Sequence, residues 1–112
     1  MRISGCDLLA RSLARAGVTF VAGKEEGALG PVFKYLRERG ITAVTPLGDI
    51  AGAFMAYGNA YYNLAPALVL TSTPAEAANA LTGVGTAWGD KVPVMVVSSR
   101  PDARAGGSPL GR

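Results

Sequence analysis

The chain has 112 residues, of which 49% are hydrophobic and 17% are charged, and its formal net charge is +3. This length fits one domain and this composition excludes a disordered chain, while no apolar run approaches the ~20 residues that a membrane-spanning helix needs. The basic residues are scattered along the chain, which argues against a nucleic-acid partner. The shortness of the apolar runs argues against a membrane partner.

The first third of the chain predicts a helix, a strand and a loop. Ser4 and Asp7 resemble a helix-start box, and apolar residues then recur at helical spacing until Gly17, which predicts a helix over residues 4–16. A short run rich in β-branched and aromatic residues predicts a buried strand over 18–22. A loop from Gly23 to Gly27 follows.

The rest of the chain alternates in the same way. An amphipathic segment that includes Leu29 and closes at Gly40 predicts the second helix. The further predicted elements are a strand over 41–45, an Ala-rich aromatic helix over 49–62, a strand over 67–70, a helix over 73–88 and a strand over 92–97. After Arg100 the pattern stops. We therefore expect a folded domain over residues 1–100 and a Gly/Pro-rich tail over 101–112.

Strands separated by helices of ten or more residues are joined by crossovers, and both faces of such a sheet are covered. The sequence therefore predicts an α/β fold, a three-layer α/β/α arrangement around a parallel sheet. The chain start has no apolar signal core and Cys6 is the single cysteine. Both features favour a cytoplasmic location.

Ligands of open parallel sheets sit beyond the carboxyl ends of the strands, so the segments after each predicted strand are candidate sites. Asp49 is the sharpest candidate, because a carboxylate at that place suits acid or base chemistry. From its position alone a helix cap is the favoured interpretation, and the two roles are compatible. The Gly23–Gly27 loop matches no phosphate-binding motif and is better interpreted as an ordinary turn.

The segment Thr71-Ser72-Thr73-Pro74 offers three hydroxyl groups and a proline suited to the first turn of a helix. Capping is the default interpretation, and binding of a polar ligand edge is the alternative. The chain contains no histidine, so a serine triad is unavailable, and no metal-ligand set is recognisable. Trp88 and the tyrosines of the 49–62 helix are candidates for an interface.

Taken together, these segments resemble the pyrimidine-binding domain of thiamine diphosphate enzymes of the acetolactate synthase and 2-oxo acid decarboxylase superfamily. The resemblance covers almost the whole predicted domain and depends on the order of several motifs. They are Gly17-Val18 to Gly23, Gly27-Ala28, Gly40-Ile41, Asp49 at the place of the family's glutamate, Ala53-Phe54-Met55-Ala56-Tyr57-Gly58, Thr71-Ser72-Thr73-Pro74, Asn79-Ala80-Leu81-Thr82-Gly83, Ala87-Trp88-Gly89-Asp90 and Val92-Pro93-Val94.

The resemblance implies thiamine diphosphate as the cofactor and a 2-oxo acid as the substrate. In the family the glutamate hydrogen-bonds the pyrimidine ring and promotes the proton transfer that activates the cofactor, and Asp49 inherits this catalytic role. The implied cofactor contacts are Gly23, Thr71, Ser72, Pro74 and Asn79. Asp49 is one methylene shorter than the glutamate, and a shift of about 1 Å at such a site can cost about a hundredfold in rate.

The family's diphosphate-binding domain carries a Gly-Asp-Gly motif and an Asn that hold the divalent metal, and the chain has no counterpart. The resemblance therefore implies a diphosphate-binding partner subunit that supplies Mg²⁺, with homodimerisation through the helix over 49–62. The family's domain also continues past the fourth strand with further helices and strands, so the resemblance implies that the chain is either a short stand-alone subunit or a fragment. Two alternatives remain: a degenerate, noncatalytic pyrimidine domain with a structural or regulatory role, and a small flavodoxin-like binding module.

Overall fold

A computed structural model of the protein describes residues 2–99. Within them, four helices alternate with four strands. The helices are α1 (Gly5–Arg15), α2 (Val32–Glu38), α3 (Asp49–Asn63) and α4 (Pro74–Gly89), and the strands are β1 (Phe20–Gly23), β2 (Thr42–Val44), β3 (Ala67–Thr71) and β4 (Val94–Ser98). The predicted order of elements is confirmed. The predicted tail over 101–112 lies outside the described residues.

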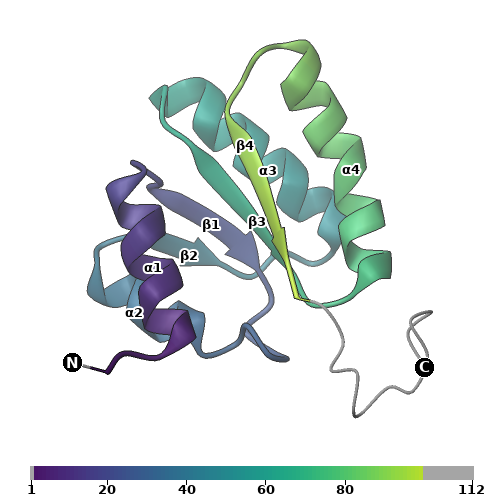
Figure 1. The fold of residues 1–112 in the computed structure, drawn as a ribbon. Helices are drawn as coiled ribbons and strands as arrows, with labels where there is room; N and C mark the ends of the chain where they lie inside the picture. The colour runs from purple at the N-terminus through teal and green to yellow at the C-terminus, as the bar shows by residue number, and fades with distance from the viewer. Residues whose placement is uncertain (1, 100–112) are drawn as a thin grey trace.

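All the strand pairs of the sheet are parallel, in the spatial order β2-β1-β3-β4. Helices α1 and α2 cover one face of the sheet, and α3 and α4 cover the other (Figure 1). The predicted three-layer α/β/α architecture with a parallel sheet is therefore confirmed. None of the helices in residues 2–99 is both long enough and apolar enough to cross a membrane.

Each face of the sheet has its own core, and the two cores differ in composition. The core under α1 and α2 contains large side chains such as Phe33, Leu36 and Leu68. The core under α3 and α4 consists mostly of alanines: Ala22, Ala53, Ala56, Ala60, Ala67 and Ala80, with Phe20 and Val69. Because alanine is small, α3 and α4 lie close to the sheet and to each other.

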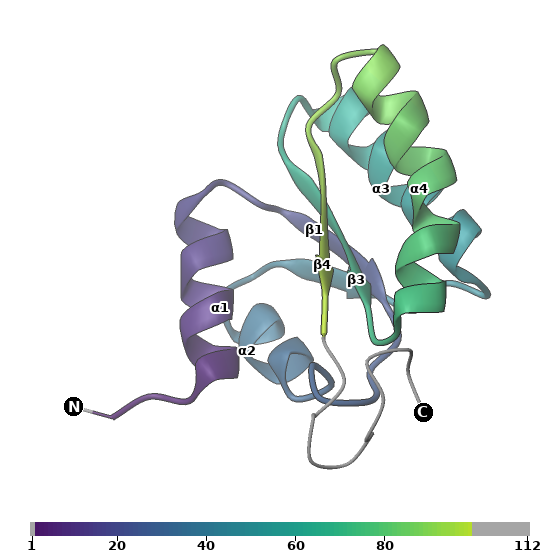
Figure 2. The same ribbon diagram turned by 45° about the vertical axis from the view of Figure 1, so that its right-hand side comes forward.

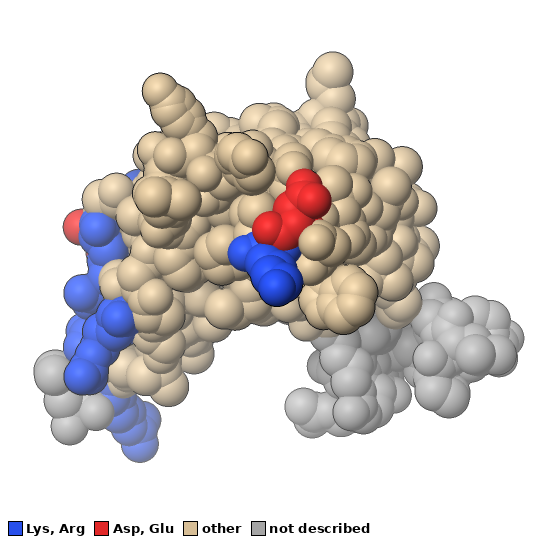
Figure 3. All heavy atoms as spheres, turned by 90° about the horizontal axis from the view of Figure 1, so that it is seen from above, with Lys and Arg blue, Asp and Glu red and all other residues tan. Residues whose placement is uncertain are grey.

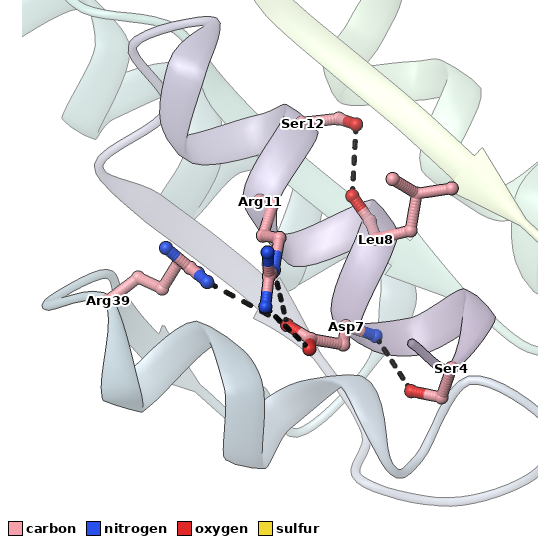
Figure 4. A network of polar contacts seen from close by, with 6 residues as sticks. All are labelled: Ser4, Asp7, Leu8, Arg11, Ser12 and Arg39. Atoms are coloured by element: carbon pink, nitrogen blue, oxygen red, sulfur yellow. Dashed lines mark hydrogen bonds and ion pairs between the residues drawn. The ribbon is translucent and has the colours of Figure 1, made fainter. Parts of the chain in front are cut away.

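Helix α1 begins as its sequence predicts. Ser4 is the N-cap residue, and its hydroxyl accepts a hydrogen bond of 3.1 Å from the Asp7 N–H. The Asp7 carboxylate in turn accepts from Arg11 at 3.2 Å and lies 3.8 Å from the Arg39 guanidinium at the end of α2 (Figure 4). The same acidic side chain thereby stabilises the first turn of α1 and ties α1 to α2.

Three elements begin two residues or more later than predicted, each because a local hydrogen bond takes precedence. The second helix begins at Val32, since the Gly30 N–H bonds the Gly27 carbonyl in a turn. The first strand begins at Phe20, because the Val18 N–H bonds the Leu13 carbonyl and closes α1. The last strand begins at Val94, because the preceding segment completes the end of α4.

Candidate functional site

The carboxyl ends of the four parallel strands meet at one edge of the sheet, where their arrows point together in Figure 1. Gly23 and Thr71 are the last residues of the adjacent strands β1 and β3, and Asp49 begins the helix that follows β2. The topology therefore places these three predicted site residues at the same edge. This edge is where open parallel sheets bind ligands.

Asp49 is the first residue of α3, and Gly48 with its extended backbone is the N-cap. The structure thus does not use the Asp49 side chain as a cap, which was one of its two predicted roles. Within residues 2–99 the carboxylate makes no hydrogen bond or ion pair, and the residue is half-buried. An acidic group in the first turn still stabilises the helix through its dipole. Its oxygens remain available to a ligand.

Thr71 ends β3 and is 1% exposed, and its Oγ1 has no hydrogen-bond partner among the described residues. Side chains alternate along a strand, so Thr71 lies on the same side of the sheet as Val69, which packs in the core under α3 and α4. A buried hydroxyl without a partner costs about 1–3 kcal/mol. This hydroxyl therefore has unused hydrogen-bonding capacity on the side of the sheet that α3 covers.

Gly23 has a clear packing role. A Cβ at this position would lie 2.7 Å from the Leu70 carbonyl oxygen of the neighbouring strand. The close approach of β1 and β3 therefore requires glycine here, whether or not a cofactor is bound.

Ser72 is engaged in three contacts within the chain. Its N–H donates to Glu76 Oε1 at 2.9 Å, and its hydroxyl donates to the Glu26 carbonyl at 3.2 Å. Its own carbonyl accepts from the Ser99 hydroxyl at 2.8 Å. These bonds join the loop after β1, the start of α4 and the end of β4. Ser72 thus has a structural role, because it holds these three segments of the candidate site together.

Helix α4 begins with a variant of the capping box. Thr73 is the N-cap and accepts from the Glu76 N–H at 3.2 Å, and Pro74 occupies the first helical position. The Glu76 carboxylate reaches one residue further back than in the usual box, to Ser72. Capping, the default interpretation of this segment, is confirmed for Thr73 and Pro74. Asn79 lies further along α4, on an exposed part of the helix.

A stripe of apolar and aromatic side chains runs along the outside of α3, and we call it the α3 stripe. Its members are Ile50, Phe54, Tyr57 and Tyr61, spaced at helical intervals, with the Phe54 and Tyr57 ring centroids 6.4 Å apart. Tyr57 donates a hydrogen bond of 2.5 Å to Asp90 at the end of α4. This bond, with desolvation and the Asp90 charge, raises the pKa of Tyr57 above its ordinary value.

The sequence-based reasoning missed Glu76 and Ser99 as partners of Ser72, and Asp90 as the partner of Tyr57. The spacing Thr73-x-x-Glu76 is itself a signal of a helix cap, and it would have identified the contact between Glu76 and Ser72. The other two contacts join residues 27 and 33 positions apart and have no local signal. Among residues 2–99, no three acidic or cysteine side chains gather into a metal-binding group.

This geometry defines an α/β domain whose candidate site residues lie at the carboxyl ends of a parallel sheet. Residues 3–108 match the family described as thiamine pyrophosphate enzyme, N-terminal TPP binding domain. The chain belongs to this family of cofactor-binding domains. The resemblance noted from the sequence is thereby confirmed.

Curated relatives support the same assignment. The large subunit of acetolactate synthase isozyme 3 from Escherichia coli K12 is 33% identical over 99 residues, which is 88% of this chain and 17% of that protein. The acetolactate synthase large subunits of Haemophilus influenzae and of Buchnera aphidicola from Schizaphis graminum are 30% and 29% identical, over 88% of this chain and 18% and 17% of theirs. The chain thus spans less than a fifth of the length of these relatives.

A solved structure shares the fold. It is the 2-oxoglutarate:ferredoxin oxidoreductase from Magnetococcus marinus with 2-oxoglutarate, coenzyme A and succinyl-CoA bound. The TM-score is 0.68 at 22% identity, over 86% of this chain and 17% of that chain.

Proposed function

We propose that the chain is the pyrimidine-binding part of a thiamine diphosphate-dependent enzyme that decarboxylates or ligates a 2-oxo acid. The observation that carries this proposal is the combination of an unpaired carboxylate and an unpaired buried hydroxyl. Asp49 and Thr71 provide them at the carboxyl ends of β2 and β3, on the side of the sheet that α3 covers.

These two groups suit the aminopyrimidine ring of the cofactor. Its ring nitrogens and amino group require both hydrogen-bond acceptors and donors, which a carboxylate and a hydroxyl supply. Bound thiamine diphosphate supplies the carbon nucleophile and electron sink for the reaction. Asp49 would hold the ring through one hydrogen bond and keep a proton in place between its carboxylate and the ring. Thr71 would fix the orientation of the ring. Gly23, Ser72, Pro74 and Asn79 are proposed as the surrounding contacts.

The 2-oxo acid class is supported by the names of the similar proteins. The solved structure is named for 2-oxoglutarate and contains it, and the curated relatives are acetolactate synthases. We therefore propose decarboxylation or carboligation as the reaction type.

The rest of the active site would come from a diphosphate-binding partner subunit, which holds the cofactor's diphosphate and Mg²⁺. Residues 2–99 gather no metal-ligand group of their own, so the metal site requires other residues. The α3 stripe supports homodimerisation, because exposed aromatic side chains at helical spacing are typical of interface cores. In this proposal the active site is complete only in the hetero-oligomer.

A noncatalytic role is the second candidate, and one observation favours it. The hydroxyl, the N–H and the carbonyl of Ser72 all form hydrogen bonds within the chain, and these bonds stabilise the fold in the absence of a ligand. In that case the domain stabilises or regulates another chain.

The test is to combine the chain with a diphosphate-binding partner, thiamine diphosphate and Mg²⁺, and to measure carbon dioxide release from pyruvate and related 2-oxo acids. Asp49→Ala is expected to abolish turnover, and Asp49→Glu to retain or raise it. Glu38→Ala, which removes an exposed acid from α2, is the matched control. Cofactor binding by the complex without turnover in any variant would support the noncatalytic role. Turnover unchanged in Asp49→Ala would remove Asp49 from the mechanism.

A further inference from the structure

The peptide group between Thr71 and Ser72 is held at both of its polar atoms. Its carbonyl, which belongs to Thr71, accepts a hydrogen bond of 3.2 Å from the Ser99 N–H. Its N–H, which belongs to Ser72, donates a hydrogen bond of 2.9 Å to Glu76 Oε1. The ends of β3 and β4 and the start of α4 meet at this place (Figure 2). Because a peptide group is planar, these two bonds fix the backbone that follows the Thr71 side chain.

The route of the Glu76 side chain is unusual for the start of a helix. In the usual capping box, the acidic side chain of the third helical residue bonds the N–H of the N-cap residue. The N-cap residue here is Thr73, whose hydroxyl accepts from the Glu76 N–H at 3.2 Å. The Glu76 carboxylate passes Thr73 and reaches Ser72, one residue closer to Thr71. It therefore immobilises the peptide group next to the buried hydroxyl as well as the first turn of α4.

The charge of Glu76 makes this bond a strong one. No ion pair within residues 2–99 engages its carboxylate, and α4 carries no basic residue. On the face shown in Figure 3, the basic side chains gather on the side of α1 and α2, apart from one acidic and basic pair. The carboxylate lies in the first turn of a 16-residue helix, where the helix dipole favours a negative charge. Because hydrogen bonds to charged acceptors are stronger than neutral ones, the Ser72 N–H is held firmly.

The same bond affects what the Thr71 hydroxyl can do. Threonine hydroxyls commonly turn toward neighbouring backbone groups and bond them. The nearest backbone donor is the Ser72 N–H, which Glu76 occupies, and the Ser72 carbonyl accepts from the Ser99 hydroxyl at 2.8 Å. Thr71 is 1% exposed, and its Oγ1 has no partner within residues 2–99. The backbone on this side is thus engaged elsewhere, and the hydroxyl keeps its capacity for a ligand.

We propose that Glu76 is a positioning residue, which fixes the orientation of the Thr71 hydroxyl for the cofactor ring by holding the Ser72 N–H. The identity of the ligand rests on the proposed function, whereas the effect on Thr71 rests on the contacts described above. The rotamer of a side chain depends on its backbone angles, so a mobile peptide group would let the Thr71 side chain turn. A hydroxyl that sampled three staggered rotamers would be in the binding orientation about a third of the time, which would weaken binding about threefold.

The first test follows the Thr71 rotamer by NMR in the whole chain without cofactor. The measured quantities are the three-bond couplings of the Thr71 methyl carbon to the backbone nitrogen and carbonyl carbon. We expect them to report one rotamer in the wild type and an average of several in Glu76→Ala. Glu76→Gln keeps an acceptor for the Ser72 N–H and should restore the single rotamer.

Thr73→Ala is the matched control for this measurement. It removes the N-cap hydroxyl of α4 and leaves both partners of the bond between Ser72 and Glu76 in place. It should lower the midpoint of chemical denaturation without averaging the Thr71 rotamer. A single rotamer in Glu76→Ala, or averaging of the same size in Thr73→Ala, would overturn the inference.

The second test measures by calorimetry how tightly the complex with a diphosphate-binding partner binds thiamine diphosphate in the presence of Mg²⁺. Glu76→Ala is expected to weaken binding about threefold, and to have no further effect in a Thr71→Val background. Equal weakening in both backgrounds would show that Glu76 does not act through Thr71, and would overturn the inference. If the complex binds no cofactor in any variant, the proposed function fails, and the NMR couplings still decide whether Glu76 positions Thr71.

Discussion

At the scale of the residue, the buried hydroxyl of Thr71 lowers the stability of the fold but suits the proposed contact with a ligand. Thr71→Val keeps the shape of the side chain and removes a buried hydroxyl that has no partner among residues 2–99. We expect the free energy of unfolding of the cofactor-free chain to rise by about 1 kcal/mol in urea denaturation. Thr42→Val, on the exposed part of β2, is the control and should change it by less than about 0.5 kcal/mol.

The same substitution should weaken thiamine diphosphate binding by the assembled complex, measured by calorimetry, if Thr71 contacts the ring. A loss of stability in Thr71→Val would instead show that the hydroxyl has a partner in the free protein. That result would remove the main structural reason for placing a ligand there.

Tyr57 gives a prediction about pH. Its pKa is raised chiefly by the hydrogen bond to Asp90, which only the protonated phenol donates. The contribution of this bond to stability is therefore complete below pH ~10, the ordinary pKa, and is lost as the pH rises through the higher pKa of the folded state. In an ultraviolet titration, Tyr57 should ionise above the ordinary pKa of a tyrosine, and Tyr57→Phe should remove that high-pH transition. A high-pH transition of unchanged size in Tyr57→Phe would contradict this assignment.

The residues of the site were only partly predictable from the sequence. Asp49 and Thr71 could be placed at the sheet edge because the alternation of strands and helices fixes which segments follow strands. That Asp49 is not the cap depends on the extended backbone of Gly48, which has no sequence signature. The unpaired state of Thr71 depends on packing by α3 and α4, which joins segments far apart in the chain.

At the scale of the element, the contact between α3 and α4 depends on one glycine. A Cβ at Gly83 would lie 2.5 Å from the Ala53 Cβ and 2.9 Å from its backbone carbonyl carbon. We expect Gly83→Ala to lower the free energy of unfolding by about 1–3 kcal/mol, because the two helices must move apart. The measurement is chemical denaturation followed by circular dichroism.

Gly85 provides the matched control for this prediction. It lies in the same helix, and a Cβ there would meet nothing within 4 Å. Gly85→Ala should therefore stabilise the protein by up to about 1 kcal/mol through helix propensity. Similar effects of the two substitutions would show that Gly83 does not limit the approach of α3 and α4.

The existence and order of the elements followed from periodicity, whereas their ends did not. The predicted helix that includes Leu29 begins at Val32, and the strand predicted from Val92 begins at Val94. In each case a turn hydrogen bond between backbone groups decides the boundary, and such bonds depend on local backbone angles that hydrophobic patterning does not encode.

At the scale of the whole molecule, the two cores should respond differently to truncation. Leu36 is fully buried among large side chains on the face that α1 and α2 cover. Leu36→Ala should cost about 2–5 kcal/mol through lost burial and the cavity it leaves, which is a large fraction of the stability of a small domain. Thermal and chemical denaturation would measure it.

The alanine-rich core has little side-chain volume to lose, so it should be sensitive to enlargement instead. Ala56→Val adds volume where α3 lies close to the sheet, and we expect it to cost about 1–3 kcal/mol. A tolerated Ala56→Val, together with a mild Leu36→Ala, would indicate that neither face is packed as tightly as the structure describes.

The position of β1 inside the sheet has a consequence for folding during synthesis on the ribosome. β1 pairs with β3 from Phe20 and Ala67 onward, so roughly fifty residues must be synthesised between the two partners. During those seconds of translation the nascent chain exposes the apolar β1 without its central neighbour. Slowed elongation before residue 71 should therefore lengthen this exposure and increase capture by chaperones, whereas a pause after Ser98 should have little effect.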